Sequence, residues 1–190
     1  KNLSLWNIDF FLNNRKIYQI GNWLRKSYAI YKLNISNYEK AIIPYNNRTI
    51  YEIQYFCKCD NIKISKNEFD SVHKQKYISD EEYNKLFKNS IIFLDLYSST
   101  CNNVIMECIQ SNTPILINRL VSIEKYLGKE YPLYYNNYNE ISNKLNPENL
   151  KEATIYLSKL NKSKFSIKNF LYTIEYNLQI NYKRKKHYFH

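Results

Sequence analysis

The stretch IIFLDLYSSTCNNVIMECIQSNTPILINR, residues Ile91–Arg119, places a polar segment between two apolar runs. Its first run, IIFLDL at Ile91–Leu96, predicts a buried strand. NVIMECIQS at Asn103–Ser111 predicts a helix, and PILINR at Pro114–Arg119 predicts a second strand. Because a helix between two short strands is typical of a βαβ unit, the stretch predicts a parallel sheet.

The same alternation of strands and helices continues on both sides of this stretch. Further strands are expected at Lys16–Gly21, Lys40–Tyr45 and Asn61–Ser65. Further helices are expected at Asn22–Leu33, Thr49–Lys58, Ser79–Asn89, Val121–Gly128, Pro147–Leu160 and about Ser166–Ile180. The pattern predicts an α/β fold, a Rossmann-like three-layer sandwich with a mainly parallel sheet, helices on both faces and extra C-terminal helices.

Specific residues mark where some of these helices begin and end. Ser79 and Glu82 have the spacing of a capping box, in which each side chain satisfies a free amide at the helix start. Asn146 and Pro147 are the expected cap and first residue of another helix. Gly128 is expected directly after the last turn of its helix.

The length of the chain limits the number of domains, and its charge limits the classes of partner. The chain has 190 residues with 44% hydrophobic content, which fits one Rossmann-like domain over residues 1–182 followed by a basic tail at 183–190. The net charge is +11, and KRKK at Lys183–Lys186 lies in the tail. This charge favours phosphates, nucleic acid or a membrane surface as partners, without choosing among them.

The cysteines indicate a reducing environment and no metal. Cys57 and Cys59, with His73 nearby, lack the ligand count and spacing of a usual zinc site. Cys101 and Cys108 are expected as small core residues. Since there is no disulfide framework, no signal peptide and no apolar run long enough to cross a membrane, a cytoplasmic location is predicted.

The polar segment YSSTCNN, Tyr97–Asn103, follows a predicted strand and leads into a predicted helix. Ligands of open α/β sheets bind beyond the carboxyl ends of the strands. Helix N-termini present free N–H groups and a partial positive charge, which bind phosphate. Further donors come from Ser98, Ser99, Thr100, Asn102 and Asn103. The segment therefore predicts a phosphate site, and the alternative is that these side chains only cap the helix.

Glu107 lies about 6–8 Å along this helix at 1.5 Å per residue. It is expected beside the inward face formed by Val104, Ile105, Cys108 and Ile109. A carboxylate there can accept hydrogen bonds from two neighbouring hydroxyls, as in a ribose. The alternative is a solvated side chain.

A second candidate phosphate site lies in QIGNWLRK, Gln19–Lys26. Gly21 lets a ligand approach the backbone closely. Arg25 can hold a phosphate through two parallel hydrogen bonds, and Lys26 adds a point charge. A tight turn followed by a solvated basic helix is the alternative.

The run LDLYSSTCNNVIMECIQSNTPILINRLVSIEKYLGKEYPLYY, Leu94–Tyr135, resembles the C-terminal, donor-binding domain of GT-B-type glycosyltransferases. IGNWLRKSYAIYKL at Ile20–Leu33 is similar to their first strand, loop and helix. YISDEEYNKLFKNSIIFLDL at Tyr77–Leu96 matches the helix and strand before their donor loop. The resemblance covers roughly residues 16–135.

The resemblance implies glycosyl transfer from a nucleoside-diphosphate sugar to an acceptor hydroxyl on a glycan, protein or lipid, without a metal or cofactor. Glu107 would bind the ribose, and Gly21, Arg25 and Lys26 would face the diphosphate. The loop at the helix start would comprise Ser99, Thr100, Cys101, Asn102 and Asn103. The acceptor domain of such enzymes precedes this region, so no catalytic base is assigned within this chain.

The chain departs from the GT-B pattern at three places. Ser99 stands where many retaining members have a second glutamate, Lys125 stands where an acid is expected, and the loop lacks glycine. Two other functions stay open: a nucleic-acid-binding protein, with the tail touching a membrane surface as a further option, and a non-catalytic domain that binds nucleotide sugar. Nucleic acid is the less favoured partner, because the aromatic residues fall mostly in core-forming segments.

Overall fold

The computed structural model describes residues 5–99, 102–166, 168–169, 171–172 and 174–176. Contacts within the chain form two units, residues 1–159 and 160–190. In the second unit, Lys162–Phe165 form a 3₁₀ helix, and the described residues between 168 and 176 are helical. The described residues from 168 to 176 fall within the helix expected at Ser166–Ile180. The predicted basic tail at 183–190 lies outside the described part of the chain.

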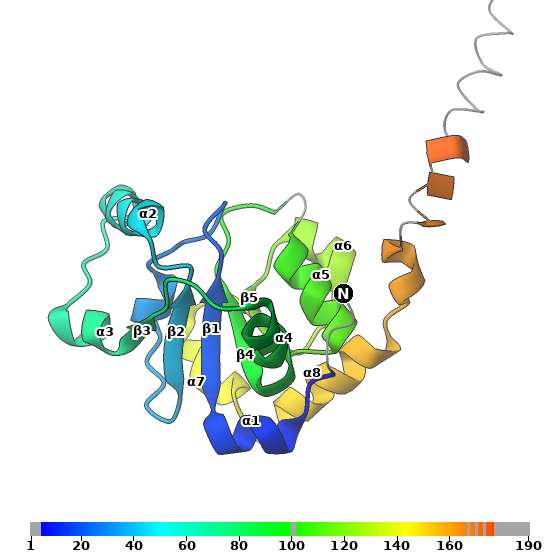
Figure 1. Ribbon diagram of the computed structural model, residues 1–190, viewed down its shortest axis with the longest axis horizontal. Helices are drawn as coiled ribbons and strands as arrows, with labels where there is room; N and C mark the ends of the chain where they lie inside the picture. The colour runs from blue at the N-terminus through cyan, green and yellow to red at the C-terminus, as the bar shows by residue number, and fades with distance from the viewer. Residues whose placement is uncertain (1–4, 100–101, 167, 170, 173, 177–190) are drawn as a thin grey trace, which may run out of the picture. The chain divides into compact units, whose positions relative to one another are not determined.

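The first unit is built on a six-stranded sheet with the order β3-β2-β1-β4-β5-β6 (Figure 1). Every neighbouring pair is parallel. The strands are β1 Lys16–Ile20, β2 Glu39–Ile43, β3 Val72–Lys74, β4 Ser90–Leu94, β5 Ile115–Asn118 and β6 Tyr134–Tyr135. This order reverses direction between β1 and β4, which is the topological switch point of a Rossmann-like sheet. The predicted fold class is therefore confirmed.

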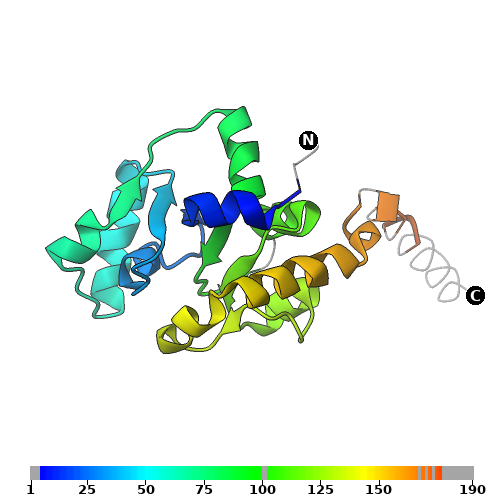
Figure 2. The same ribbon diagram turned by 90° about the horizontal axis from the view of Figure 1, so that it is seen from below.

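Helices cover both faces of this sheet. Figure 2 shows α4 on one side of the strands and α8 on the other. The helices are α1 Ile8–Asn14, α2 Asn47–Cys59, α3 Lys66–Asp70, α4 Asp80–Asn89, α5 Asn103–Ser111, α6 Val121–Leu127, α7 Ile141–Lys144 and α8 Pro147–Lys159. Because helices pack on both faces, all five residues of β4 are buried and the strand is apolar after its first residue.

The helix signals of the sequence are confirmed. Ser79 and Glu82 form the capping box of α4, in which Glu82 N lies 3.2 Å from Ser79 Oγ and Ser79 N lies 2.8 Å from Glu82 Oε2. Asn146 Oδ1 accepts a hydrogen bond from Asn149 N at 2.8 Å in the first turn of α8. Gly128 follows α6 with a φ of +81°.

Two predicted elements are wrong. Residues Asn22–Leu33 form turns and one short 3₁₀ helix at Ala29–Lys32 instead of a helix along their whole length. Leu24 has a φ of 57°, which a right-handed helix excludes. The Lys26 amide donates to the Asp95 carbonyl, and the Leu24 carbonyl accepts from Tyr97 N, so both groups bond to another loop instead of within a helix. Asn61–Ser65 is not a strand, because Ser65 already caps α3 through a capping box. The strand beside β2 is β3, which follows α3.

Candidate functional site

The loops that follow β1 and β4 are joined at the switch point. Arg25 and Leu96 form an antiparallel β-bridge. Lys26 N donates to the Asp95 carbonyl at 2.8 Å, and Tyr97 N donates to the Leu24 carbonyl at 3.0 Å. These bonds place the two predicted phosphate-binding segments side by side at the carboxyl edge of the sheet, where ligands of such sheets bind.

Arg25 lies at the N-terminus of α5. Its guanidinium Nη2 is 3.2 Å from Asn102 Oδ1, although the two residues are 77 positions apart. Asn102 is the cap of α5, and its Oδ1 also accepts from Ile105 N at 3.4 Å. A second bond from Arg25 Nη1 reaches the Trp23 carbonyl at 3.0 Å. The structure therefore brings together two of the residues predicted to bind phosphate.

The Arg25 side chain is buried, with 7% of the residue exposed. Burial lowers the pKa of Arg25, while the nearby Tyr83 and Glu52 act in the opposite direction. Its buried Nε has no hydrogen-bond partner among the described residues. A buried cation with an unpaired N–H group beside a helix N-terminus is suited to bind an anion.

Gly21 is required by the position of Arg25. Its φ is +76°, a conformation that favours glycine, and a Cβ atom at this position would lie 3.2 Å from both Cζ and Nη1 of Arg25. The sequence predicts that a glycine here lets a ligand approach the backbone closely. In the structure, the group that approaches the Gly21 backbone is the guanidinium of Arg25.

Glu107 lies on α5 and is half-buried. Its Oε2 accepts a hydrogen bond from the hydroxyl of Tyr83 on α4, at 2.7 Å. Tyr83 was not among the residues predicted from the sequence. The signal that could have found it is a single aromatic residue within the polar run SDEEYNK, in the helix that precedes the site strand.

The remaining loop residues are only partly described. Ser99 is 4% exposed, and its hydroxyl has no hydrogen-bond partner within the described residues. Asn103 is the exposed first residue of α5. Thr100 and Cys101 lie outside the described residues, so the predictions for these two residues are not tested. Cys108 is fully buried, as expected for a small core residue.

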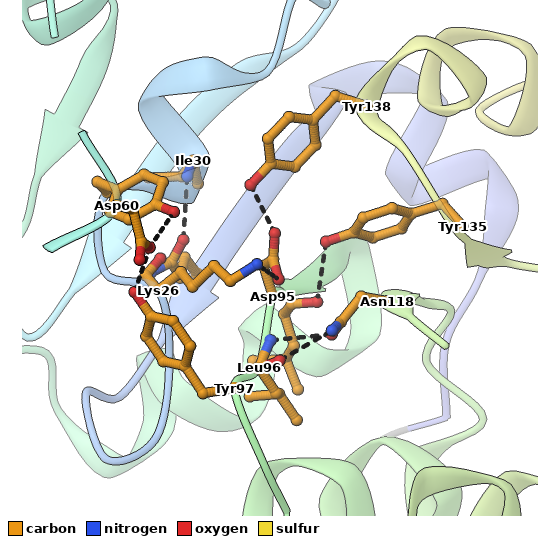
Figure 3. Close-up of polar contacts among 12 residues, drawn as sticks. Lys26, Ile30, Asp60, Asp95, Leu96, Tyr97, Asn118, Tyr135 and Tyr138 are labelled. Carbon is orange, nitrogen blue, oxygen red and sulfur yellow. Dashed lines mark hydrogen bonds and ion pairs between the residues drawn. The ribbon is translucent and has the colours of Figure 1, made fainter. Parts of the chain in front are cut away.

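Lys26 contacts different residues from its neighbour Arg25. Its Nζ forms an ion pair with Asp95 Oδ1 at 3.3 Å and lies 5.4 Å from the centre of the Tyr97 ring (Figure 3). Asp95 also accepts from the Tyr138 hydroxyl at 2.5 Å. Sequence reasoning missed Asp95, although it is the only charged residue in IIFLDL and directly follows β4.

A second carboxylate beside this group is bonded to two tyrosines. Asp60 accepts hydrogen bonds from Tyr28, at 2.5 Å, and from Tyr97. Burial acts to raise the pKa of Asp60, but the hydrogen bonds from Tyr28 and Tyr97 and the charge of Lys26 together lower it. Figure 3 shows Asp60, Tyr97, Lys26 and Asp95 as neighbours.

The described residues contain neither a metal-binding cluster nor a membrane-spanning helix. Within them, no group of three or more His, Cys, Asp and Glu side chains is placed to hold a metal ion. None of the described helices is both long enough and apolar enough to cross a membrane.

The comparisons with known proteins show a likeness in fold. No family model matches the sequence, and no curated protein matches it. A solved structure, an α,α-trehalose-phosphate synthase (UDP-forming) from Burkholderia vietnamiensis, matches with a TM-score of 0.57 and 8% sequence identity. The match covers 88% of this chain and 46% of that one, so this chain spans about half of that protein. The fold therefore resembles part of a GT-B glycosyltransferase.

Proposed function

We propose that this chain is the donor-binding domain of a GT-B-type glycosyltransferase, which binds a nucleoside-diphosphate sugar and supports glycosyl transfer to an acceptor hydroxyl. The observation that carries the proposal is the contact of Arg25 with Asn102 at the start of α5. It joins a buried cation to a helix N-terminus at the switch point of the sheet, and Glu107 follows about one turn further along the same helix.

The diphosphate binds where Arg25 meets the first turn of α5. Arg25 supplies a positive charge, and the helix supplies free N–H groups. Lys26 adds positive charge at the same edge, partly balanced by Asp95. The loop around the phosphates comprises Gly21, Ser99, Thr100, Cys101, Asn102 and Asn103.

The ribose lies along the flank of α5, where Glu107 accepts hydrogen bonds from its hydroxyls. A carboxylate would repel a phosphate but is a strong acceptor for two adjacent hydroxyl groups. The Tyr83 hydroxyl donates a hydrogen bond to Oε2 of Glu107. Because an ionised carboxylate has about four acceptor sites, Glu107 can still accept from the sugar hydroxyls.

The transfer breaks the bond between the anomeric carbon and the diphosphate oxygen and forms a bond from that carbon to the acceptor oxygen. Charge builds on the departing diphosphate, and Arg25 together with the α5 N-terminus stabilises that charge. The acceptor is a glycan, a protein or a lipid. Its proton passes to a base that we assign to a separate acceptor domain.

Thermal unfolding tests the proposal directly. We expect one of UDP, GDP and ADP to raise the melting temperature, because a ligand that binds only the folded state stabilises it. Glu107→Ala should weaken binding of that nucleotide about tenfold or more, since hydrogen bonds to a charged group contribute about 1.5–3 kcal/mol. Glu152→Ala, an exposed acid on α8, is the matched control and should bind as wild type does.

Two results would overturn the proposal. The first is no stabilisation by any of the three nucleotides. The second is stabilisation only by short RNA, with a steep dependence on salt, which would support a nucleic-acid-binding protein instead. Equal binding by wild type and Glu107→Ala would remove the ribose role from Glu107 while leaving the phosphate site intact.

A further inference from the structure

The side chain of Glu107 is held from a neighbouring helix. The hydroxyl of Tyr83, on α4, donates to Glu107 Oε2 at 2.7 Å. We propose that Tyr83 is a positioning residue, which sets the Glu107 carboxylate for the ribose so that the site prefers ribonucleotides to 2′-deoxyribonucleotides. This inference rests on the proposed function, because it concerns the same nucleotide site.

The ring of Tyr83 is fixed by its own surroundings. It packs edge-on against the ring of Phe87, with 5.1 Å between the centroids, and Phe87 is fully buried one turn later on α4. The capping box of Ser79 and Glu82 fixes the start of the same helix. The hydroxyl of Tyr83 is therefore presented from a rigid element, which gives a more precise position than a loop would.

The helix that carries Glu107 is tied to the helix that carries Tyr83. Ser111 Oγ lies 2.7 Å from both the Glu107 carbonyl and Thr113 Oγ1, and its single proton goes to one of these two acceptors. Thr113 Oγ1 donates in turn to the Phe87 carbonyl at 2.5 Å. These buried bonds link the end of α5 to the end of α4. The distance between Tyr83 and Glu107 is thus set by the fold as well as by their own hydrogen bond.

Tyr83 is suited to act as a permanent donor. Burial raises its pKa most, and the hydrogen bond to Glu107 and the charge of that residue raise it further. The hydroxyl therefore keeps its proton at neutral pH and donates to the carboxylate. A glutamate that is already fixed loses little rotamer freedom when it binds, and this pre-organisation favours ligands that use it.

The test is to compare each ribonucleotide with its 2′-deoxy form in wild type and in Tyr83→Phe, using the nucleoside diphosphate that stabilises the wild type best. We expect wild type to bind the ribo form more tightly. Tyr83→Phe should reduce that preference about fivefold to tenfold, the equivalent of one hydrogen bond, and lower the affinity for the deoxy form much less, because that form keeps only the 3′-hydroxyl. Isothermal titration calorimetry measures both affinities.

Two controls separate positioning from a general loss of structure. Tyr77→Phe removes a hydroxyl from a side chain that is 83% exposed just before α4, and it should leave the preference unchanged. In the Glu107→Ala background, adding Tyr83→Phe should cause no further loss, because Tyr83 acts only through Glu107. If Tyr83→Phe folds poorly, it is measured with trimethylamine N-oxide, which strengthens the folded state.

The outcomes distinguish this inference from the proposed function. If wild type binds none of the nucleotides, the proposed function fails. If wild type prefers the ribo form and Tyr83→Phe keeps that preference, only the role of Tyr83 is overturned. An equal loss for the ribo and deoxy forms also overturns it, because a residue that sets Glu107 for both ribose hydroxyls cannot act equally on a ligand that lacks the 2′-hydroxyl.

Discussion

Lys26 Nζ lies 3.3 Å from Asp95 Oδ1, and this ion pair joins the loop after β1 to the end of β4. The residue before it, Arg25, contacts Asn102 at the start of α5. Two consecutive basic residues thus have separate partners, one directly after β4 and one at the start of α5. The backbone bond from Lys26 N to the Asp95 carbonyl holds the pair in place from the other side.

We predict that Lys26→Met destabilises the protein more than Asp95→Asn does. The Asp95 side chain is 4% exposed, so removal of Lys26 leaves a buried charge that keeps its hydrogen bond from Tyr138 but has lost its cation. Because Lys26 is 29% exposed, we expect a cost of about 1–3 kcal/mol, below the range for a fully buried pair. Asp95→Asn removes the charge itself and should cost about 1 kcal/mol.

Urea unfolding measures both changes in free energy. Lys125→Met, at an exposed position on α6, is the control and should unfold as wild type does. A Lys26→Met protein as stable as wild type would show that water replaces the ammonium group beside Asp95, and the prediction would be wrong.

The two glycines of the chain allow a matched comparison. Gly21→Ala should lower the free energy of unfolding by about 1–3 kcal/mol, because its φ is +76° and the new methyl group would press on the guanidinium of Arg25. Nucleotide affinity should fall as well, since Arg25 must move. Gly128 has a φ of +81°, and a methyl group there would press on the Tyr156 hydroxyl. Gly128→Ala should therefore lower the free energy of unfolding without changing the nucleotide affinity.

Thermal unfolding measures the stability of both glycine variants, and nucleotide titration measures their affinity. If the two variants lose affinity to the same extent, the loss comes from general destabilisation and not from Arg25. If neither loses stability, the positive φ values are tolerated and the prediction fails.

The sequence predicted the parallel sheet and the position of α5 because those features depend on local signals. The apolar run of β4 and the nine residues of α5 match their predicted ranges closely. The helix at Asn22–Leu33 was wrong because its apolar spacing suits a helix, while tertiary hydrogen bonds to Asp95 and Tyr97 decide the backbone.

The site could be predicted only in part for the same reason. Topology brings the ends of β1 and β4 together, so the proximity of Gly21 and Arg25 to the α5 cap follows from the strand order. The contact between Tyr83 and Glu107 spans 24 residues and depends on how α4 packs on α5. Side-chain partners of this kind carry no periodic signal in the sequence.

Asp60 should make stability fall at low pH. Burial alone would raise its pKa, but hydrogen bonds from Tyr28 and Tyr97 and the charge of Lys26 lower it below the usual value of 3.8. A carboxyl group with a lowered folded pKa stabilises the protein above its unfolded pKa, and this contribution is lost as pH falls through the folded value. We therefore expect the loss below about pH 4.

The measurement is urea unfolding at a series of acidic pH values. Asp60→Asn cannot titrate, so its stability should change less steeply with pH over this range than that of wild type. Asp70→Asn, at an exposed position, is the control and should follow the wild-type curve. Parallel curves for wild type and Asp60→Asn would contradict the prediction.

Tyr31→Phe should stabilise the protein. Tyr31 is 1% exposed, and its hydroxyl has no hydrogen-bond partner among the described residues. Removal of a buried, unpaired hydroxyl relieves a desolvation cost of about 1–3 kcal/mol, partly offset by a small cavity, so we expect a gain of about 1 kcal/mol near neutral pH.

The same substitution should act more strongly at alkaline pH. Burial raises the pKa of Tyr31 above 10.0, so the unfolded chain releases this proton first and wild type loses stability as pH rises above about 10. Phenylalanine does not titrate, and the gain from Tyr31→Phe should therefore grow with pH in this range. Urea unfolding at neutral and alkaline pH checks both effects. A lower stability of Tyr31→Phe at neutral pH would mean that the hydroxyl is hydrogen-bonded in solution, for example to a buried water molecule.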